Sequence, residues 1–353
     1  MKLLPFVFLV ITVSCSTDKV LKYRAAEFPQ EQELTYTTIA PNVPSKYILG
    51  LHIKDSILLV QGNDGNHCFF AYNKNTGKYI MPFFQIGRGP FEGVSPGFIE
   101  APGDSCIITE SNLRKGYFFS LSGLINGDPD FFREFTFQFP EERSQMMANN
   151  PVMLEENKYL LTVPFSAAER FAVYTNPYTD GKKEIKHISR TYPKITEEPD
   201  AVNAAILQHI NRYAVSPDGT KLVHLSFIGA IAETFEIGKD TARPIAIKGF
   251  LRPEYQLMGS GISPANEGMI GFGDVIASDD YFYAIYYNTP YNKDNLRTIA
   301  VFDWELNPVR SYTVKDRILY MTSDPRTGYV YAVVNNQKTH EYDIIKFDES
   351  FIR

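Results

Sequence analysis

The apolar and polar positions of this chain follow a repeated pattern. Six times, a polar turn is followed by a run in which apolar residues alternate with others, as in "KDSILLV" at 54, "DGTKLVH" at 218 and "RTGYVYAV" at 326. After each run, an aromatic residue ends a further strand-like stretch just before another polar turn, as in "FFAYNKNTGK" and "IIKFDES". Turns between short alternating runs are typical of β-hairpins. The chain is therefore expected to consist of strands, arranged in six similar units.

The spacing of the units selects the fold. They recur at intervals of about 50 to 60 residues, which is too short for β-α-β units and suits the four-stranded blades of a propeller. Six blades fill residues 46–353, but the last unit ends after three strands. The stretch "EQELTYTTIA" at 31–40 alternates like an edge strand and is expected to supply the fourth. The pattern predicts one all-β domain over residues 31–353, a six-bladed propeller of four-stranded blades whose ring is closed by an N-terminal strand.

One segment has a helical pattern. In "EEPDAVNAAILQHINRY" at 197–213, Pro199 stands where a helix accepts proline, and apolar residues recur at helical spacing over about two turns. The segment either forms a helix or runs into the first strand of the fourth blade.

The N-terminus predicts export. "MKLLPFVFLVITVSC" has one lysine, an apolar run at 3–13 and a small residue before Cys15. Because each helical residue adds about 1.5 Å, the run covers only about half of a bilayer core and is typical of a signal peptide. It resembles a bacterial lipoprotein signal, although Thr12 stands where leucine is preferred. The resemblance implies a signal peptide over 1–14, lipidation of Cys15 and a tether over 15–30; the alternative is an ordinary secretory signal.

Composition supports strands and excludes one class of partner. Aromatic residues make up 14% of the chain and favour strands. The formal charge of −6 is spread without long like-charge runs, so no nucleic-acid partner is expected, and the membrane is contacted only through the lipid anchor. Cys68 and Cys106 lie in apolar runs, where a buried free thiol is commoner than the disulfide that export would permit.

Two turns carry a family resemblance. "SPDGTK" at 216–221 resembles the turn of TolB-like and WD40-like propeller repeats, and its residues suit a tight turn. "GRGPFEG" at 87–93 is similar to a run in exported six-bladed TolB-like propeller lipoproteins of Gram-negative bacteria. The resemblance implies a fold and a compartment, an outer-membrane lipoprotein facing the periplasm or the cell surface, but no common reaction. Gly87, Gly89, Pro90 and Glu92 match that pattern, whereas Phe91 and Gly93 stand where glycine and an aromatic residue are usual.

The same stretch lacks the features of a phosphate loop. Pro90 removes one backbone donor, and no helix follows the glycines. A turn between two blades is the favoured interpretation. The alternative is that Arg88 and Glu92 face the central channel and contact a ligand.

Propeller topology predicts where the long loops gather. If the repeated polar turn joins the first two strands of each blade, the loops between blades share the opposite face with the loops between strands two and three. Five unusual stretches fall in such loops, at 62–67, 87–92, 190–203, 249–272 and 288–295. Long insertions on a rigid scaffold commonly carry binding residues. The candidate ligand-binding residues are His67, Arg88, Glu92, Arg252, Glu254, Tyr255 and Tyr291.

Metal and catalytic motifs are poorly represented. The six histidines form no HxxxH or HExxH pair, and no Cys–His cluster has zinc spacing. No GxSxG motif is present, and Ser260 in "MGSGIS" is interpreted as a loop residue. No cofactor is expected, although separate blades could together hold calcium. The candidate calcium ligands are Asp64, Glu92 and Asp274.

These observations favour a noncatalytic binding protein of the cell envelope. We expect a monomer whose insertion-rich face recognises an envelope protein or a small-molecule ligand, because the loops are long on one face and short on the other. The alternative is a calcium-dependent hydrolase or lactonase with its site in the central channel. A third possibility is a structural envelope component without a small ligand.

Overall fold

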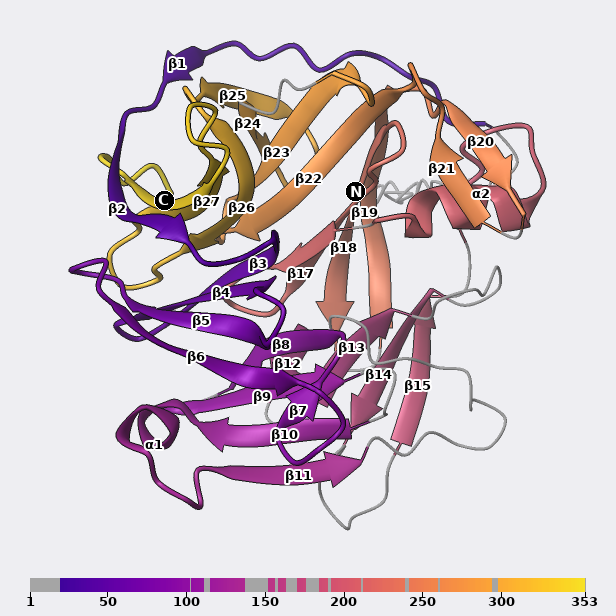
Figure 1. Cartoon of the computed structure of the whole chain (residues 1–353). Coiled ribbons are helices and arrows are strands. Elements are labelled where there is room, and N and C mark those ends of the chain that lie inside the picture. Colours follow the sequence, from indigo (N-terminus) through magenta and orange to yellow (C-terminus); the bar gives the residue numbers. More distant parts are fainter. Residues whose placement is uncertain are drawn as a thin grey trace, which may run out of the picture.

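The strands that the structure describes form six sheets of four or five strands and one separate hairpin (Figure 1). The sheets are arranged as the blades of a propeller, which confirms the prediction of an all-β propeller. Cys15 and Ser260 lie outside the described residues. The computed structural model describes residues 20–101, 103–110, 115–136, 152–155, 158–162, 170–175, 184–189, 192–210, 212–238, 241–259, 261–293 and 298–352.

The first three sheets are consecutive in the chain. Sheet one contains β3 (Tyr47–Lys54), β4 (Ile57–Asn63), β5 (His67–Asn73), β6 (Tyr79–Ile86) and the short parallel strand β7 (Glu92–Gly93). Sheet two contains β8 (Pro96–Glu100), β9 (Ser105–Glu110), β10 (Lys115–Ser120) and β11 (Phe132–Thr136). Sheet three contains β12 (Val152–Glu155), β13 (Lys158–Thr162), β14 (Phe171–Thr175) and β15 (Glu184–Ser189).

The later sheets include two strands from the N-terminal part of the chain. Sheet four contains β16 (Arg212–Val215), β17 (Lys221–Leu225), β18 (Ala230–Gly238) and β19 (Thr241–Leu251), and the hairpin of β20 (Tyr255–Met258) and β21 (Gly261–Pro264) follows it. Sheet five contains β22 (Met269–Ala277), β23 (Tyr281–Pro290), β24 (Thr298–Asp303), β25 (Pro308–Thr313) and β1 (Glu31–Glu33). Sheet six contains β26 (Arg317–Ser323), β27 (Val330–Asn335), β28 (Tyr342–Phe347) and β2 (Tyr36–Val43).

The hydrophobic core lies between neighbouring sheets. Strands in the middle of a sheet are packed on both faces, so β4 and β5 are buried over most of their length and consist of nearly continuous apolar runs. The first strands of the sheets contact one another around the centre: β3 contacts β26, and β22 contacts both β16 and β26. This arrangement leaves the first strands to line the central channel.

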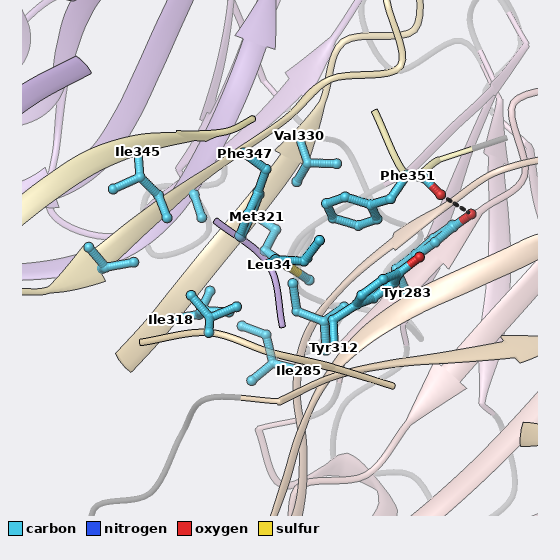
Figure 2. Close-up of a cluster of buried hydrophobic side chains, with 14 of the residues drawn as sticks. Leu34, Tyr283, Ile285, Tyr312, Ile318, Met321, Val330, Ile345, Phe347 and Phe351 are labelled. Carbon is cyan, nitrogen blue, oxygen red and sulfur yellow. Dashed lines mark hydrogen bonds between the residues drawn. The ribbon is translucent and has the colours of Figure 1, made fainter. Parts of the chain in front are cut away.

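The cluster between sheets five and six contains both ends of the propeller (Figure 2). Leu34 enters it from the segment between β1 and β2, and Phe351 enters it from the residues after β28. The hydroxyl of Tyr283 donates a hydrogen bond to the backbone carbonyl of Phe351, at 3.2 Å. Burial of these side chains holds the two ends together in one core.

Residues 20–43 form an extended N-terminal strap across sheets four, five and six (Figure 1). Tyr23 forms a β-bridge with Gly249 of β19, and Phe28 makes edge contacts with aromatic rings of β23 and β24. Strand β1 then pairs in parallel with β25, and β2 pairs antiparallel with β28. The expected tether therefore packs against the propeller from residue 20 onward.

The predicted edge strand at 31–40 is divided in the structure. Its first part, β1, pairs with sheet five, whereas β2 pairs with sheet six and extends to Val43. Leu34 lies between them and is only 6% exposed, because it fills the core between the two sheets. The chain consequently leaves one sheet and joins the next at this residue.

The segment at 197–213 is expected to form a helix or to run into a strand, and it does both. Helix α2 (Asp200–Gln208) occupies its middle, and β16 begins at Arg212. The sequence did not predict helix α1 (Leu121–Asn126), which Ser120 caps by accepting a hydrogen bond from the backbone N–H of Gly123. In the described part of the chain, no helix is long and apolar enough to cross a membrane.

Cys68 and Cys106 are buried free thiols in the cluster between sheets one and two, as predicted. Burial and the nearby carboxylate of Glu110 raise the pKa of Cys68 to about 12. Both thiols are therefore expected to be unreactive in the folded protein.

Candidate functional site

The first strands of the sheets enclose a cavity at the centre of the propeller. Its volume is about 280 Å³, and strands β3, β16, β22 and β26 supply most of its lining. Apolar residues such as Leu51, Phe98 and Val275 line it together with a group of polar side chains. The polar side chains of the lining are His52, Gln61, Arg212, Tyr213, Asp274, Tyr320 and Thr322.

One group in the lining consists of a guanidinium, a carboxylate and a phenol. The Nη2 atom of Arg212 donates a hydrogen bond to the hydroxyl of Tyr320 at 3.3 Å, and the guanidinium lies 5.7 Å from the centre of that ring. Asp274 accepts a hydrogen bond at 2.8 Å from the backbone N–H of Met321. Tyr287 is close enough for its pKa, which burial raises to about 12, to respond to Arg212 and Asp274. Three sheets thus contribute to one polar site.

The carboxyl of Asp274 is held in an unfavourable environment. Burial raises its pKa to about 6, although Arg212 and the backbone N–H of Met321 partly offset this effect. The group therefore changes its charge near pH 6. Binding and catalytic sites often retain a partly buried carboxylate even though its burial lowers the stability of the folded protein.

Asp274→Asn is expected to stabilise the protein at neutral pH. Because the folded-state pKa lies above the unfolded value of 3.8, the stability contribution of Asp274 is fully present below pH 3.8 and is lost as pH rises through 6. The substitution should thus be nearly neutral at pH 4 and add about 1–2 kcal/mol above pH 7, a figure reduced for partial exposure. Urea denaturation at both pH values measures this; a difference between variant and wild type that does not depend on pH would contradict it.

A second group in the lining contains an imidazole that stays neutral. The Nε2 atom of His52 lies 3.3 Å from the side-chain oxygen of Gln61, whose amide nitrogen donates to the carbonyl of Pro96 at 2.6 Å. The ring of His52 lies 4.6 Å from that of Phe98. Burial lowers the pKa of His52 to about 4. At pH 7 this side of the cavity is therefore polar but uncharged.

Gly50 and Gly273 leave room for the polar side chains of His52 and Tyr287. A Cβ atom at Gly273 would lie 2.4 Å from the hydroxyl of Tyr287, and one at Gly50 would lie 3.0 Å from Nε2 of His52. Both distances are too short for a larger residue without displacement of the polar side chain. The glycines in β3 and β22 consequently help to shape the cavity.

A series of aromatic rings connects the cavity with the loops at 288–295. The ring of Tyr291, a predicted ligand residue, lies 6.3 Å from that of Phe227. Phe227 in turn lies 5.8 Å from Tyr287, which is close to the charged pair of the cavity. Tyr291 is 49% exposed and lies at the outer end of this series.

The stretch "IGRGPFE" joins sheet one to sheet two, as the junction interpretation expects. The chain leaves β6, turns, and returns beside it as the parallel strand β7 before it enters β8. The carboxylate of Glu92 accepts a hydrogen bond at 2.6 Å from the backbone N–H of Gly89, so it closes the turn. Arg88 is exposed, and neither Arg88 nor Glu92 lines the cavity. A ligand contact of Arg88 and Glu92 elsewhere in the channel stays a prediction.

Phe91 explains why this turn has its shape. Its φ is 55°, in the left-handed region that favours glycine, and the side chain is 8% exposed. In this conformation the ring fills the space between sheets one and two. It contacts the rings of Phe84, Tyr117, Phe119, Phe131 and Phe132, with centroid distances of 4.9–5.6 Å.

The other predicted ligand residues fall into two separate groups. His67 lies with Asp64 in the β4–β5 turn, which is joined to the β6–β7 turn by a hydrogen bond from the N–H of Ile86 to the carbonyl of Asn66. Arg252 and Glu254 are exposed residues before the β20–β21 hairpin, and Tyr255 is partly buried in it. None of the seven predicted ligand residues, all of them within the described residues, lines the cavity.

The candidate calcium ligands are not brought together. Burial raises the pKa of Asp64, but hydrogen bonds from the backbone of Asn66 and His67 and from the His67 ring outweigh this and lower it. Glu92 closes its own turn, and Asp274 lies in the central cavity. Among the described residues there is no group of three or more His, Cys, Asp or Glu side chains that could hold a metal ion. The three candidate calcium ligands therefore lie in three separate places.

A buried ionic network joins sheets three and four, and the sequence did not predict it. Arg170 donates to both carboxylate oxygens of Glu233, one at 2.7 Å, and lies 2.7 Å from Nδ1 of His224. These residues are 2–4% exposed. Burial raises the pKa of Glu233, but Arg170 and His224 lower it to about 2. The sequence contained one indication of this network: Glu233 is a charged residue within the mostly apolar strand "AIAETFEIG".

Comparison with known proteins supports the fold but shows no family. No protein-family model and no curated protein matches the chain. A Bacteroides fragilis protein described as exported has 12% identity and a TM-score of 0.55, over 93% of this chain and 99% of its own. A luciferin-regenerating enzyme has 9% identity and a TM-score of 0.53, over 91% and 97%. A gluconolactonase of Xanthomonas campestris has 10% identity and a TM-score of 0.53, over 93% and 98%.

Proposed function

We propose that this chain is an exported propeller that binds a small organic acid in its central cavity without catalysing a reaction. The observation that carries the proposal is the group formed by Arg212, Tyr320 and Asp274 in a cavity of about 280 Å³. A guanidinium can donate paired hydrogen bonds to a carboxylate. Asp274 can accept from a hydroxyl or amine of the same ligand, or donate to it when protonated.

The size and lining of the cavity define the ligand class. Small-molecule sites usually have volumes of about 300–1,000 Å³, so this cavity of about 280 Å³ suits only a small ligand. Apolar walls with a few placed polar groups are typical of such sites. We therefore infer a ligand with one carboxylate, at least one hydroxyl or amine, and a short carbon skeleton.

We further propose that the six sheets are the six blades of a ring closed by β2, and that the mature protein is an outer-membrane lipoprotein anchored at Cys15. The pairing of β2 with β28 supports closure. The signal-like N-terminus and the "GRGPFEG" turn support membership of the exported TolB-like lipoproteins. Attachment to the membrane by the chain terminus leaves the propeller free to act as a monomer.

A thermal-shift panel at pH 5.5 and pH 8 tests the proposed ligand class. The probes are acetate, glycolate, lactate, alanine and glucuronate, with glucose as a neutral control. We expect at least one hydroxy or amino acid to raise the melting temperature, and to do so more at pH 5.5, because protonation of Asp274 removes a negative charge beside the ligand. If no probe shifts wild type more than it shifts an Arg212→Gln variant, the proposal fails.

The alternative function as a calcium-dependent hydrolase has its own test. Since the described residues provide no group of acidic ligands, we expect the melting temperature to be the same with calcium as with a chelator. Stoichiometric calcium in the purified protein, together with a rise in melting temperature, would contradict the binding model and favour the enzyme. A partner protein on the long-loop face remains compatible with ligand binding in the cavity.

A further inference from the structure

We propose that the tip of the β20–β21 hairpin inserts into the surface of the bilayer in which the chain is anchored. The inference rests on the proposed lipid anchor at Cys15. It gives the membrane a second contact with the protein, in addition to the anchor. Two contacts of this kind would fix the orientation of the propeller on the membrane.

The hairpin tip is the most apolar exposed feature of the described residues. Leu257 is 67% exposed and Met258 is 62% exposed, more than any other large hydrophobic side chain that the structure describes. The residues from 255 to 263, "YQLMGSGIS", include no charged side chain. Uncharged segments with exposed Leu or Met avoid the cost of burying a charge and can enter the interfacial region of a bilayer.

The base of the hairpin is firmly held. Its strands pair over four positions, from Tyr255 with Pro264 to Met258 with Gly261. Tyr255 and Ile262 pack in one hydrophobic cluster with residues of α2, beside which the hairpin lies in Figure 1. The tip therefore projects from a rigid support.

The start of the described chain lies at the same support. Leu21 and Tyr23 belong to that cluster, and the N–H of Leu21 donates to the carbonyl of Lys194 at 2.9 Å. Gly249 lets Tyr23 approach, since a Cβ atom there would lie 2.6 Å from the tyrosine ring. The first described residues of the chain thus lie beside the hairpin.

Chain length makes the bilayer the expected occupant of the tip. Cys15 lies six residues before Leu21 of the cluster, so an acylated Cys15 stays within about 20 Å of it. The tip lies beside the same cluster, because Leu257 pairs directly with the cluster residue Ile262 and Met258 is the next residue of the strand, about 3.4 Å further along. The membrane and the tip are therefore within reach of one another. Two exposed side chains are also far fewer than a stable protein interface needs, which is about 20–30 residues a side.

The experiment uses the acylated mature chain, which begins at Cys15, in vesicles of phosphatidylethanolamine and phosphatidylglycerol. Met258→Cys is labelled with bimane, whose fluorescence is quenched by lipids that carry a spin label near the headgroup. The matched control is Asn75→Cys, an exposed residue in the β5–β6 turn. Cys68 and Cys106 are buried and do not compete for the label.

We expect quenching of at least about twofold at position 258 and none at position 75. Leu257→Cys should behave like Met258→Cys, which separates insertion from a local effect of one substitution. An acylated chain in which both 257 and 258 are quenched no more than 75 overturns the inference and leaves the anchor intact. A mature chain without an acyl group at Cys15 overturns the anchor and the inference together.

Discussion

Glu233→Ala is expected to destabilise the folded protein by about 3–5 kcal/mol, because it leaves a buried guanidinium without its counter-ion. Arg170, 3% exposed, has both terminal nitrogens on Glu233, and its Nε atom has no hydrogen-bond partner among the described residues. His224 cannot replace the carboxylate, because an imidazole carries no negative charge; burial and Arg170 lower its pKa, which favours the neutral form. Urea unfolding followed by the fluorescence of the single Trp304 measures the loss.

The matched control for this variant lies on the same strand. Glu236 pairs with Arg243, but their side chains are 51% and 77% exposed, so Glu236→Ala should cost less than about 1 kcal/mol. The effect of Glu233→Ala should also depend on pH. The lowered pKa makes the contribution of Glu233 present above its unfolded value of 4.5 and lost as pH falls through 2. Equal losses of unfolding free energy in Glu233→Ala and Glu236→Ala at pH 7 would contradict a stabilising role of the buried ionic network.

Phe91→Ala is expected to cost about 3–5 kcal/mol, because a buried ring in contact with five others is removed. The left-handed φ of 55° adds a second expectation. Phe91→Gly should be less destabilising than Phe91→Ala by up to about 1 kcal/mol, since glycine adopts this conformation without strain. The free energies of unfolding of both variants, from the same urea titrations, test this order.

A buried phenylalanine in a regular strand provides the control. Phe302 in β24 is fully buried and has no positive φ, so there alanine should be better tolerated than glycine. If glycine is also the worse substitution at position 91, the left-handed conformation there does not determine which residue is tolerated.

The fold could be predicted further than the site, for a physical reason. Hairpins and blades follow from local alternation and turn residues, so the repeated pattern was sufficient to identify a propeller. The division of the N-terminal strand at Leu34 depends on packing between two sheets and is not visible in the alternation. The same holds for Phe91, whose role appears only when five rings from two sheets are placed around it.

The polar group of the cavity combines residues far apart in the chain. Arg212, Asp274 and Tyr320 lie in three different first strands, and none belongs to a motif. Asp274 was identified from the sequence, but as a weak calcium ligand. The length of the loops favoured residues at the rim of the propeller instead. Of these, Arg88 is exposed on the surface, and Glu92 closes its own turn. A charged residue near the centre of an apolar strand, as at Asp274 and Glu233, was the better signal.

The most direct test of the account is calorimetric titration of the small acid that gives the largest thermal shift, with wild type, Arg212→Gln and Arg88→Gln. Arg212 lines the cavity, whereas Arg88 is exposed outside it. A hydrogen bond to a charged group contributes about 1.5–3 kcal/mol, so Arg212→Gln should weaken binding by at least about tenfold. Arg88→Gln should bind as wild type does. Unchanged affinity in Arg212→Gln, or a loss confined to Arg88→Gln, would contradict the assignment of the binding site to the central cavity.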